Sequence, residues 1–228
     1  MLDSSKRVSR DKRQEAYTTL AVMFVALLLI SNIAATKLIE FKVGSVQAIF
    51  DGGALLFPFT YVLGDVLAEV YGFKRTRSVI FMGFFASLLA AGVFLLVQVM
   101  PSPVEYVHQE AYAAVLGFVP RIVFASLAAY LVGQLLNAYV LVKIKERWGS
   151  RNLWARLLGS SLIGEAADTL VFCTIAFYGV LVAGSFWNYV LVGYLYKMVV
   201  EVVLIPVSYL IIGRIKRITP HNRKESND

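Results

Sequence analysis

Four pairs of polar side chains recur at helical spacing inside otherwise apolar stretches of this 228-residue sequence. In each pair the two residues stand three or four positions apart, so both side chains lie on one face of a helix. Carboxylates, amides and one amine are the groups that hold a ligand by charge-assisted hydrogen bonds. The pairs are Asp65 with Glu69, Gln134 with Asn137, Glu165 with Asp168, and Lys197 with Glu201.

The four pairs lie at similar depths within their apolar segments. Asp65 is about 15 Å from Arg75, and Glu165 about 13 Å from Arg156, at the helical rise of ~1.5 Å per residue. Lys197 stands close to the midpoint of its own segment. The spacing therefore predicts a belt of polar groups around one interior cavity near the middle of a membrane.

Charged groups at this depth need an explanation, because each costs a few kcal/mol or more in a bilayer. Structural pairing is one: Lys197 could neutralise Asp168 or Asp65, or pair with Glu201 in its own helix. Charges on so many helices exceed what bundle specificity needs, so we favour a ligand cavity. We interpret Glu69, which is nearer an interface, and Glu201 as coupling or structural charges.

The composition is typical of an integral membrane protein, with 58% hydrophobic and 16% charged residues. Apolar runs of about 20 residues are long enough to cross a hydrocarbon core of ~30 Å. We expect an all-α integral membrane protein with six transmembrane helices. These are expected at Tyr17–Ile39, Ala54–Tyr71, Ser78–Met100, Val119–Val142, Ala155–Val182 and Trp187–Ile212.

The distribution of Lys and Arg orients these spans. Basic residues crowd both ends of the chain and the links at 74–77 and 143–156, whereas the alternate links carry few. By the positive-inside rule the rich side is the cytoplasm, so both termini are expected there. We expect a basic tail at 1–16, a six-helix transporter domain at 17–212 and a second basic tail at 213–228. The net charge of +7 then implies no nucleic acid partner.

Small residues and a proline shape the predicted helices. Pro58 follows the turn signal FDGG at Phe50–Gly53, and it predicts a kink or interruption like those that build transporter sites. Small residues at four-residue spacing predict close helix packing. They are Gly83, Ser87 and Ala91 in the third span, and Ala125, Ala129 and Gly133 in the fourth.

Aromatic side chains accompany the polar belt, so a planar polar ligand suits the cavity. A carboxylate can accept adjacent N–H donors of a guanine-like edge in a bidentate way, while aromatic rings stack on its faces. The composition alone does not choose a purine over an amino acid or a cation. The aromatic residues are Phe57, Phe59, Tyr61, Phe172, Tyr194 and Tyr196.

Few residues in the sequence indicate an enzyme. Both histidines, His108 and His221, stand outside the predicted spans, which argues against a His-based catalyst or metal site. The single Cys173 cannot form an internal disulfide. An aspartyl pair of Asp65 and Asp168 rests only on a Gly-Asp dipeptide, and the chain carries no phosphate-binding GxxxxGK[ST] motif. We expect no enzyme, no metal and no cofactor.

The ordered motifs resemble the queuosine-precursor transporter family, also called the vitamin uptake transporter family, over about residues 17–212. The resemblance rests on SN at Ser31–Asn32, FPF at Phe57–Phe59, Asp65 before Tyr71–Gly72, Arg121, GQ at Gly133–Gln134, DT at Asp168–Thr169, YLYK ending at Lys197, and Pro206.

The resemblance implies a multi-pass importer in the bacterial plasma (inner) membrane. Its substrates would be 7-deazaguanines such as preQ0 and preQ1, salvaged for queuosine in tRNA. The resemblance implies six substrate contacts, and the polar pairs add Asn137 and Glu165 to them. Glu69 and Glu165 depart from the family pattern. The predicted substrate-binding set is Asn32, Asp65, Arg121, Gln134, Asn137, Glu165, Asp168 and Lys197.

The mechanism that we favour is secondary-type transport by alternating access. The short likeness of GDVLAE in the second span to GEAAD in the fifth suggests a 3+3 inverted repeat. Two alternatives stay open: a substrate-binding subunit of an ATP-driven importer of the energy-coupling-factor type, and an intramembrane enzyme or assembly factor. The sequence leaves open the coupling ion and a homodimer.

Overall fold

The computed structural model describes residues 2–44, 46–148 and 153–218 and is built mainly of long helices. Within these described residues, six segments are long and apolar enough to cross a membrane, which agrees with the predicted number of spans. A β-hairpin between the first two is an addition that the all-α prediction lacked. The elements are α1 (Leu2–Ala34), β1 (Leu38–Val43), β2 (Val46–Asp51), η1 (Gly52–Leu56), α2 (Phe57–Tyr71), α3 (Phe73–Val99), α4 (Gln109–Val115), η2 (Leu116–Phe118), α5 (Val119–Trp148), α6 (Leu153–Phe177) and α7 (Ala183–Ile218).

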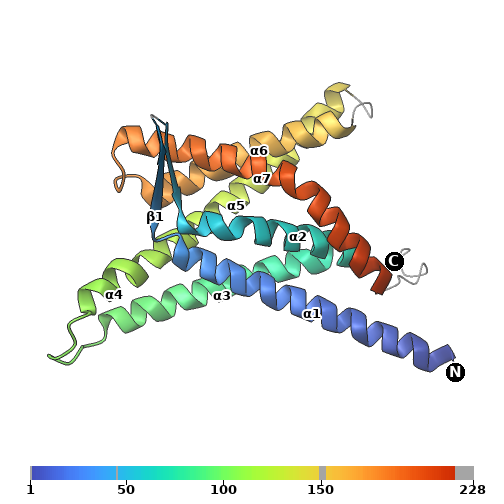
Figure 1. Ribbon diagram of the computed structural model, residues 1–228, viewed down its shortest axis with the longest axis horizontal. Coiled ribbons are helices and arrows are strands. Elements are labelled where there is room, and N and C mark those ends of the chain that lie inside the picture. The colour runs from blue at the N-terminus through green and yellow to red at the C-terminus, as the bar shows by residue number, and fades with distance from the viewer. Residues whose placement is uncertain (1, 45, 149–152, 219–228) are drawn as a thin grey trace.

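The helix ends and the connections lie on two opposite sides of the molecule, which we call the tail end and the hairpin end. Figure 1 shows the start of α1, the α2–α3 junction, the end of α5, the start of α6 and the end of α7 at the tail end. The hairpin, the α3–α4 connection and the α6–α7 connection lie at the other end. The tail end therefore collects the predicted basic links, of which 149–152 and 219–228 lie outside the described residues.

The predicted small-residue face of α3 is buried against α1. A Cβ added at Gly83 would lie 2.8 Å from Leu28 Cδ2, so the helices touch closely here. Asn32 Nδ2 donates a hydrogen bond to Ser87 Oγ (3.1 Å), and Ser126 Oγ donates to Asn32 Oδ1 (3.1 Å). Asn32 thus ties α1 to both α3 and α5.

A reciprocal glycine contact joins α5 to α6. A Cβ added at Gly133 would lie 2.9 Å from Asp168 Cβ, and one at Gly164 would lie 2.8 Å from Asn137 Cβ. Each glycine also faces the carbonyl oxygen of the other at 3.0–3.1 Å from the added atom. The two helix backbones can approach this closely because both contact residues are glycines without a side chain. As a result, the polar pairs of α5 and α6 lie beside one another.

The start of α2 differs from the prediction. Pro58 occupies the first turn of the helix, where its missing N–H has no intrahelical partner to lose, so it begins α2 and does not kink it. The FDGG turn is instead the end of β2 and a 3-10 turn, capped by Asp51, whose Oδ1 accepts from the Gly53 N–H (2.8 Å). Lys37, expected in the first span, lies in the turn that follows α1.

A second proline does bend a helix, in α7. Pro206 lies inside this helix, where it cannot donate a backbone hydrogen bond, and α7 changes direction along its length in Figure 1. Glu201 precedes the proline and the buried Ser208 follows it. The far part of α7 thereby returns toward α2.

Candidate functional site

Two adjoining cavities lie one after the other along the helices. The aromatic cavity, of about 330 Å³, is on the hairpin side, and the polar cavity, of about 490 Å³, is on the tail side. Both volumes suit a small ligand, for which pockets measure roughly 300–1,000 Å³. The residues that line both are Phe57, Thr60, Tyr61, Tyr130, Asp168 and Lys197.

Aromatic rings from seven described elements line the aromatic cavity. Its surface is largely apolar, with a carboxylate at each end: Asp51 near the hairpin and Asp168 at the junction with the polar cavity. Such walls suit a flat ligand that stacks on ring faces while its polar edge reaches a carboxylate. The rings include Phe50, Phe57, Phe84, Tyr130, Phe172 and Tyr189.

The polar cavity gathers most of the predicted belt. It is formed by α2, α5, α6 and α7, which bring together side chains far apart in the sequence, as predicted from their common depth. Their role in binding a substrate stays a prediction. The members that line it are Asp65, Gln134, Asn137, Glu165, Asp168, Lys197 and Glu201.

Lys197 lies where the two cavities meet. Its ammonium donates a hydrogen bond to Asp168 Oδ2 and lies 3.5 Å from Glu165 Oε2, so its ion pairs go to α6. The ammonium also lies 5.6 Å from the centre of the Phe57 ring, within cation–π range. The Lys197 side chain is 21% exposed, so these charges meet in a poorly solvated place where their attraction is strong.

Among the described residues, two buried acceptors that line the polar cavity accept no hydrogen bond. Neither Glu165 Oε2 nor Asn137 Oδ1 takes part in a hydrogen bond within the part of the chain that the structure describes. The ion pair of Glu165 with Lys197 is long, which agrees with the missing hydrogen bond. A ligand that brings N–H donors would satisfy both atoms.

Asp65 has a different partner from Asp168. Ser208 Oγ, which follows Pro206 in α7, donates a hydrogen bond to Asp65 Oδ2 (3.0 Å). Each of the two aspartates is thus bound to α7 through its own donor. This arrangement offers no positive support for an aspartyl catalytic pair.

Three predicted residues lie apart from the polar cavity. Arg121 donates from Nε to the Ile175 carbonyl and from Nη2 to the Tyr178 carbonyl, both 2.7 Å, and so caps the end of α6. Asn32 lines the aromatic cavity. Glu69 is one turn beyond Asp65, outside the lining of both cavities.

Asp51 and Tyr189 are site residues that the sequence analysis missed. Asp51 is 9% exposed, and its Oδ2 accepts a hydrogen bond from Tyr189 Oη (2.6 Å). Burial raises the pKa of Asp51, while the hydrogen bonds from Tyr189 and the Gly53 N–H act in the opposite direction. The sequence signal was the aspartate of FDGG, which we interpreted only as part of a turn.

Residues 51–211 match the family described as "Putative vitamin uptake transporter". This chain belongs to that family. The match begins at Asp51 and includes α2 to α6 and most of α7, and so covers all four helices that form the polar cavity. Membership supports transport over catalysis and confirms the resemblance found in the sequence.

Named relatives of this vitamin uptake transporter family member come from three bacteria. It is 29% identical over 175 residues to a "Probable queuosine precursor transporter" of Bacillus subtilis, covering 76% of this chain and 75% of the relative. It is 31% identical over 160 residues to a protein of the same name in Haemophilus influenzae, with coverage of 69% and 66%. The "Queuosine precursor transporter" of Escherichia coli is 28% identical over 198 residues, with coverage of 86% and 85%. No solved structure matches the chain.

Proposed function

We propose that this protein imports queuosine precursors, 7-deazaguanine bases such as preQ0 and preQ1, across a bacterial plasma membrane for salvage into tRNA queuosine. The names of three relatives support the substrate class. The observation that carries the proposal is the ion cluster of Lys197, Asp168 and Glu165 at the junction of an aromatic and a polar cavity.

The junction matches the chemistry of such a base. The flat ring system stacks among Phe57, Tyr130 and their aromatic neighbours, and its guanine-like edge turns toward the carboxylates of α6. Adjacent N–H donors of that edge satisfy a carboxylate in a bidentate way, and the Lys197 ammonium donates to an acceptor of the ring. Asp65, Gln134 and Asn137 contact the base as it passes through the polar cavity.

Transport is of the secondary type, by alternating access around this junction. The basic tail end faces the cytoplasm and the hairpin end faces outward, following the positive-inside rule. The α1–α3 and α5–α7 halves move against one another as an inverted repeat does. Carboxylates of the polar cavity are the groups through which a proton would couple to the substrate.

Arg121 contributes differently in this proposal. Because its guanidinium bonds carbonyls at the end of α6, it fixes the helix that carries Glu165 and Asp168. It therefore acts on the site through α6 and does not touch the base.

The test is uptake by the purified protein alone in liposomes, with labelled preQ0 and preQ1 and guanine as competitor. Asp168→Asn removes a carboxylate at the junction, while Glu146→Gln removes one from an exposed ion pair with Lys143 and serves as the matched control. We expect saturable entry that Asp168→Asn abolishes and Glu146→Gln leaves unchanged.

The other outcomes separate the alternatives. Binding without entry would indicate a subunit that needs an ATP-driven partner. Neither binding nor entry by protein shown to be folded would contradict the proposed substrate.

A further inference from the structure

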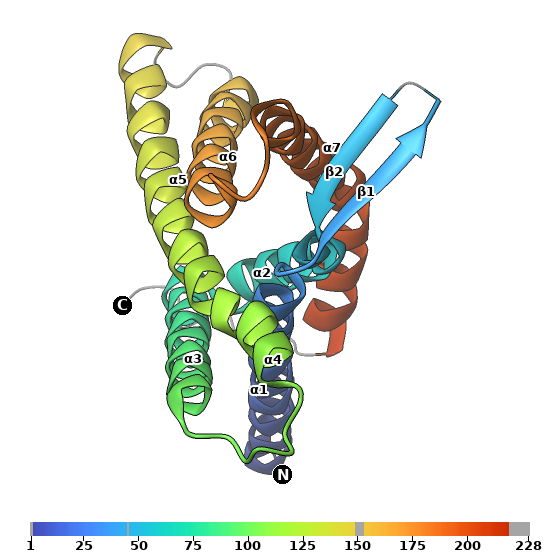
Figure 2. The ribbon, with the colours of Figure 1, turned by 90° about the vertical axis from the view of Figure 1, so that its left-hand side faces the viewer.

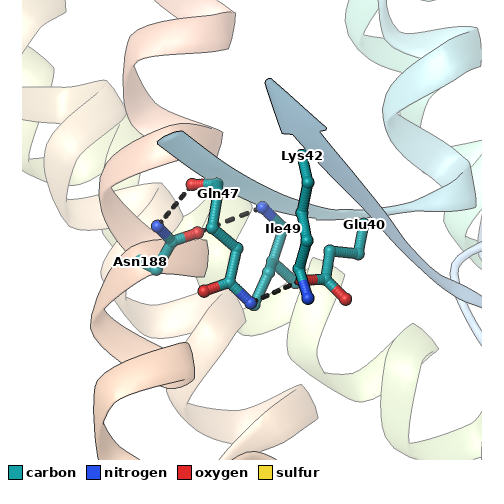
Figure 3. A network of polar contacts seen from close by, with 5 residues as sticks. All are labelled: Glu40, Lys42, Gln47, Ile49 and Asn188. Carbon is teal, nitrogen blue, oxygen red and sulfur yellow. Dashed lines mark hydrogen bonds and ion pairs between the residues drawn. The ribbon is translucent and has the colours of Figure 1, made fainter. Parts of the chain in front are cut away.

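The β1–β2 hairpin is fastened to the first turns of α7 by one asparagine. Asn188 Oδ1 accepts from the Ile49 N–H (3.1 Å), and its Nδ2 donates to the Gln47 carbonyl (2.7 Å). Figure 3 shows the amide facing the backbone of β2 at both positions. The side chain therefore fills the place of a neighbouring strand at the free edge of β2.

The next residue of α7 fastens the base of the same hairpin. Tyr189, which is 2% exposed, donates to Asp51 at the end of β2. Asp51, Tyr189 and Phe50 all line the aromatic cavity, so this part of the hairpin is its wall. Figure 1 and Figure 2 show the hairpin crossing the first part of α7 and rising from beside the start of α2.

The other polar contacts of the hairpin side chains are of another kind. Glu40 accepts from Gln47 Nε2 (2.6 Å) and pairs with Lys42 (3.1 Å), all within the hairpin and exposed. These contacts hold the hairpin together without attaching it to α7. An isolated two-stranded hairpin is marginal in water, so its position depends on α7.

The root of the hairpin is also held by the end of α1 and by the turn that follows it. The Gly52 N–H donates to the Lys37 carbonyl (2.8 Å), and a Cβ added at Gly52 would lie 2.5 Å from the Ala34 carbonyl oxygen. The hairpin can therefore leave α7 by breaking the bonds of Asn188 and Tyr189 and withdrawing Ile49 from the apolar cluster that it shares with Phe186 and Tyr189, while its ladder stays intact.

We propose that Asn188 and Tyr189 are positioning residues that hold the hairpin as the outer wall of the aromatic cavity, and that releasing them opens this cavity at the hairpin end. The inference rests on the proposed passage of substrate through the two cavities. Its test needs no substrate, so it can fail or succeed independently of that function.

Cys173 is a built-in reporter for this opening. It is the single cysteine of the chain, is buried and lines the aromatic cavity. The rate at which a bulky, water-soluble maleimide modifies Cys173 in nanodiscs measures how often the cavity opens. Asn188→Ala removes two hydrogen bonds, for which we expect a roughly tenfold faster modification.

Graded and matched variants make the test specific. Asn188→Asp keeps the acceptor for the Ile49 N–H and is expected to fall between the wild type and Asn188→Ala, while Tyr189→Phe also accelerates modification. Glu40→Ala removes two polar contacts inside the hairpin, and Arg13→Ala removes a bond to the Val70 carbonyl at the tail end. Both controls are expected to keep the wild-type rate.

The proposal is overturned if Asn188→Ala and Tyr189→Phe react no faster than Glu40→Ala. Equal acceleration in all variants, controls included, would also overturn it, because it would indicate general loosening. Should Asn188→Ala fail to fold, as judged by size-exclusion chromatography, Asn188→Asp and Tyr189→Phe carry the comparison.

Discussion

Among single residues, Lys197 is the one whose replacement tests whether the buried charges are structural or functional. Replacing it by Met leaves Asp168 and Glu165 without their cation, which typically costs roughly 3–5 kcal/mol of stability for a buried pair. We expect Lys197→Met to lower the melting temperature and abolish substrate binding. The double variant Lys197→Met with Asp168→Asn removes the uncompensated charge and should recover much of the stability but no binding. Recovery of binding in the double variant would show that the pair is structural.

Glu165 is expected to distinguish the two precursors. Its Oε2 is a buried acceptor in the polar cavity, and preQ1 carries a cationic aminomethyl group that preQ0 lacks. Glu165→Gln should therefore weaken preQ1 binding more than preQ0 binding. Glu69→Gln, on a residue outside both cavity linings, should affect neither. Titration of both ligands against the purified variants measures the difference, and equal losses for the two ligands would contradict it.

The site residues that the sequence predicted are those that a pattern of near neighbours in the chain makes recognisable. Paired spacing placed Glu165 beside Asp168 on one helix face, because three or four residues make one turn. Asp51 and Arg121 differ because their partners are distant. Tyr189 is 138 positions from Asp51, and the carbonyls bound by Arg121 are 54 and 57 positions away. No local pattern in the sequence encodes such contacts.

Among the elements, the α5–α6 glycine contact positions the polar pairs. Gly164→Ala would bring a methyl group within 2.8 Å of Asn137 Cβ, and overpacking of this kind typically costs ~1–3 kcal/mol. We expect a lower melting temperature and weaker substrate binding, because α6 carries Asp168 away from Lys197. Gly92→Ala in α3 is the matched control, since no described atom beyond its chain neighbours and the nearby backbone of its own helix lies within 4 Å of the added Cβ. A Gly164→Ala variant that matched this control would contradict the packing argument.

The helices were predicted and the hairpin was missed, although both have a local signal. A membrane span is recognised by its length and apolar composition, because the bilayer supplies the same solvent to every span. The strands 38–43 and 46–51 are two β-type runs around Gly44-Ser45, which is a hairpin signal, but their position depends on Asn188 of α7, which is 139 and 141 positions from its partners. The position of Pro58 was also misinterpreted: whether it interrupts or begins α2 depends on where β2 ends.

In the whole molecule, the basic links and the two cavities are ordered along the same direction, from the tail end to the hairpin end. The links rich in Lys and Arg gather at the tail end, where the polar cavity also lies, while the aromatic cavity adjoins the hairpin. A base entering from the hairpin side would meet ring faces first and the carboxylates of α6 next. In the proposed transport, the direction in which the base moves thus depends on which end faces the cytoplasm.

Cysteine labelling in intact cells tests this orientation. In a Cys173→Ser background, Val104→Cys places a thiol in the α3–α4 connection, where Val104 is 99% exposed, and Lys74→Cys places one at the exposed tail end. Because basic links stay in the cytoplasm, an impermeant maleimide should label Val104→Cys in intact cells and Lys74→Cys only after permeabilisation. The reverse pattern would place the tail end outside, and the polar cavity would then be the entrance of the import path.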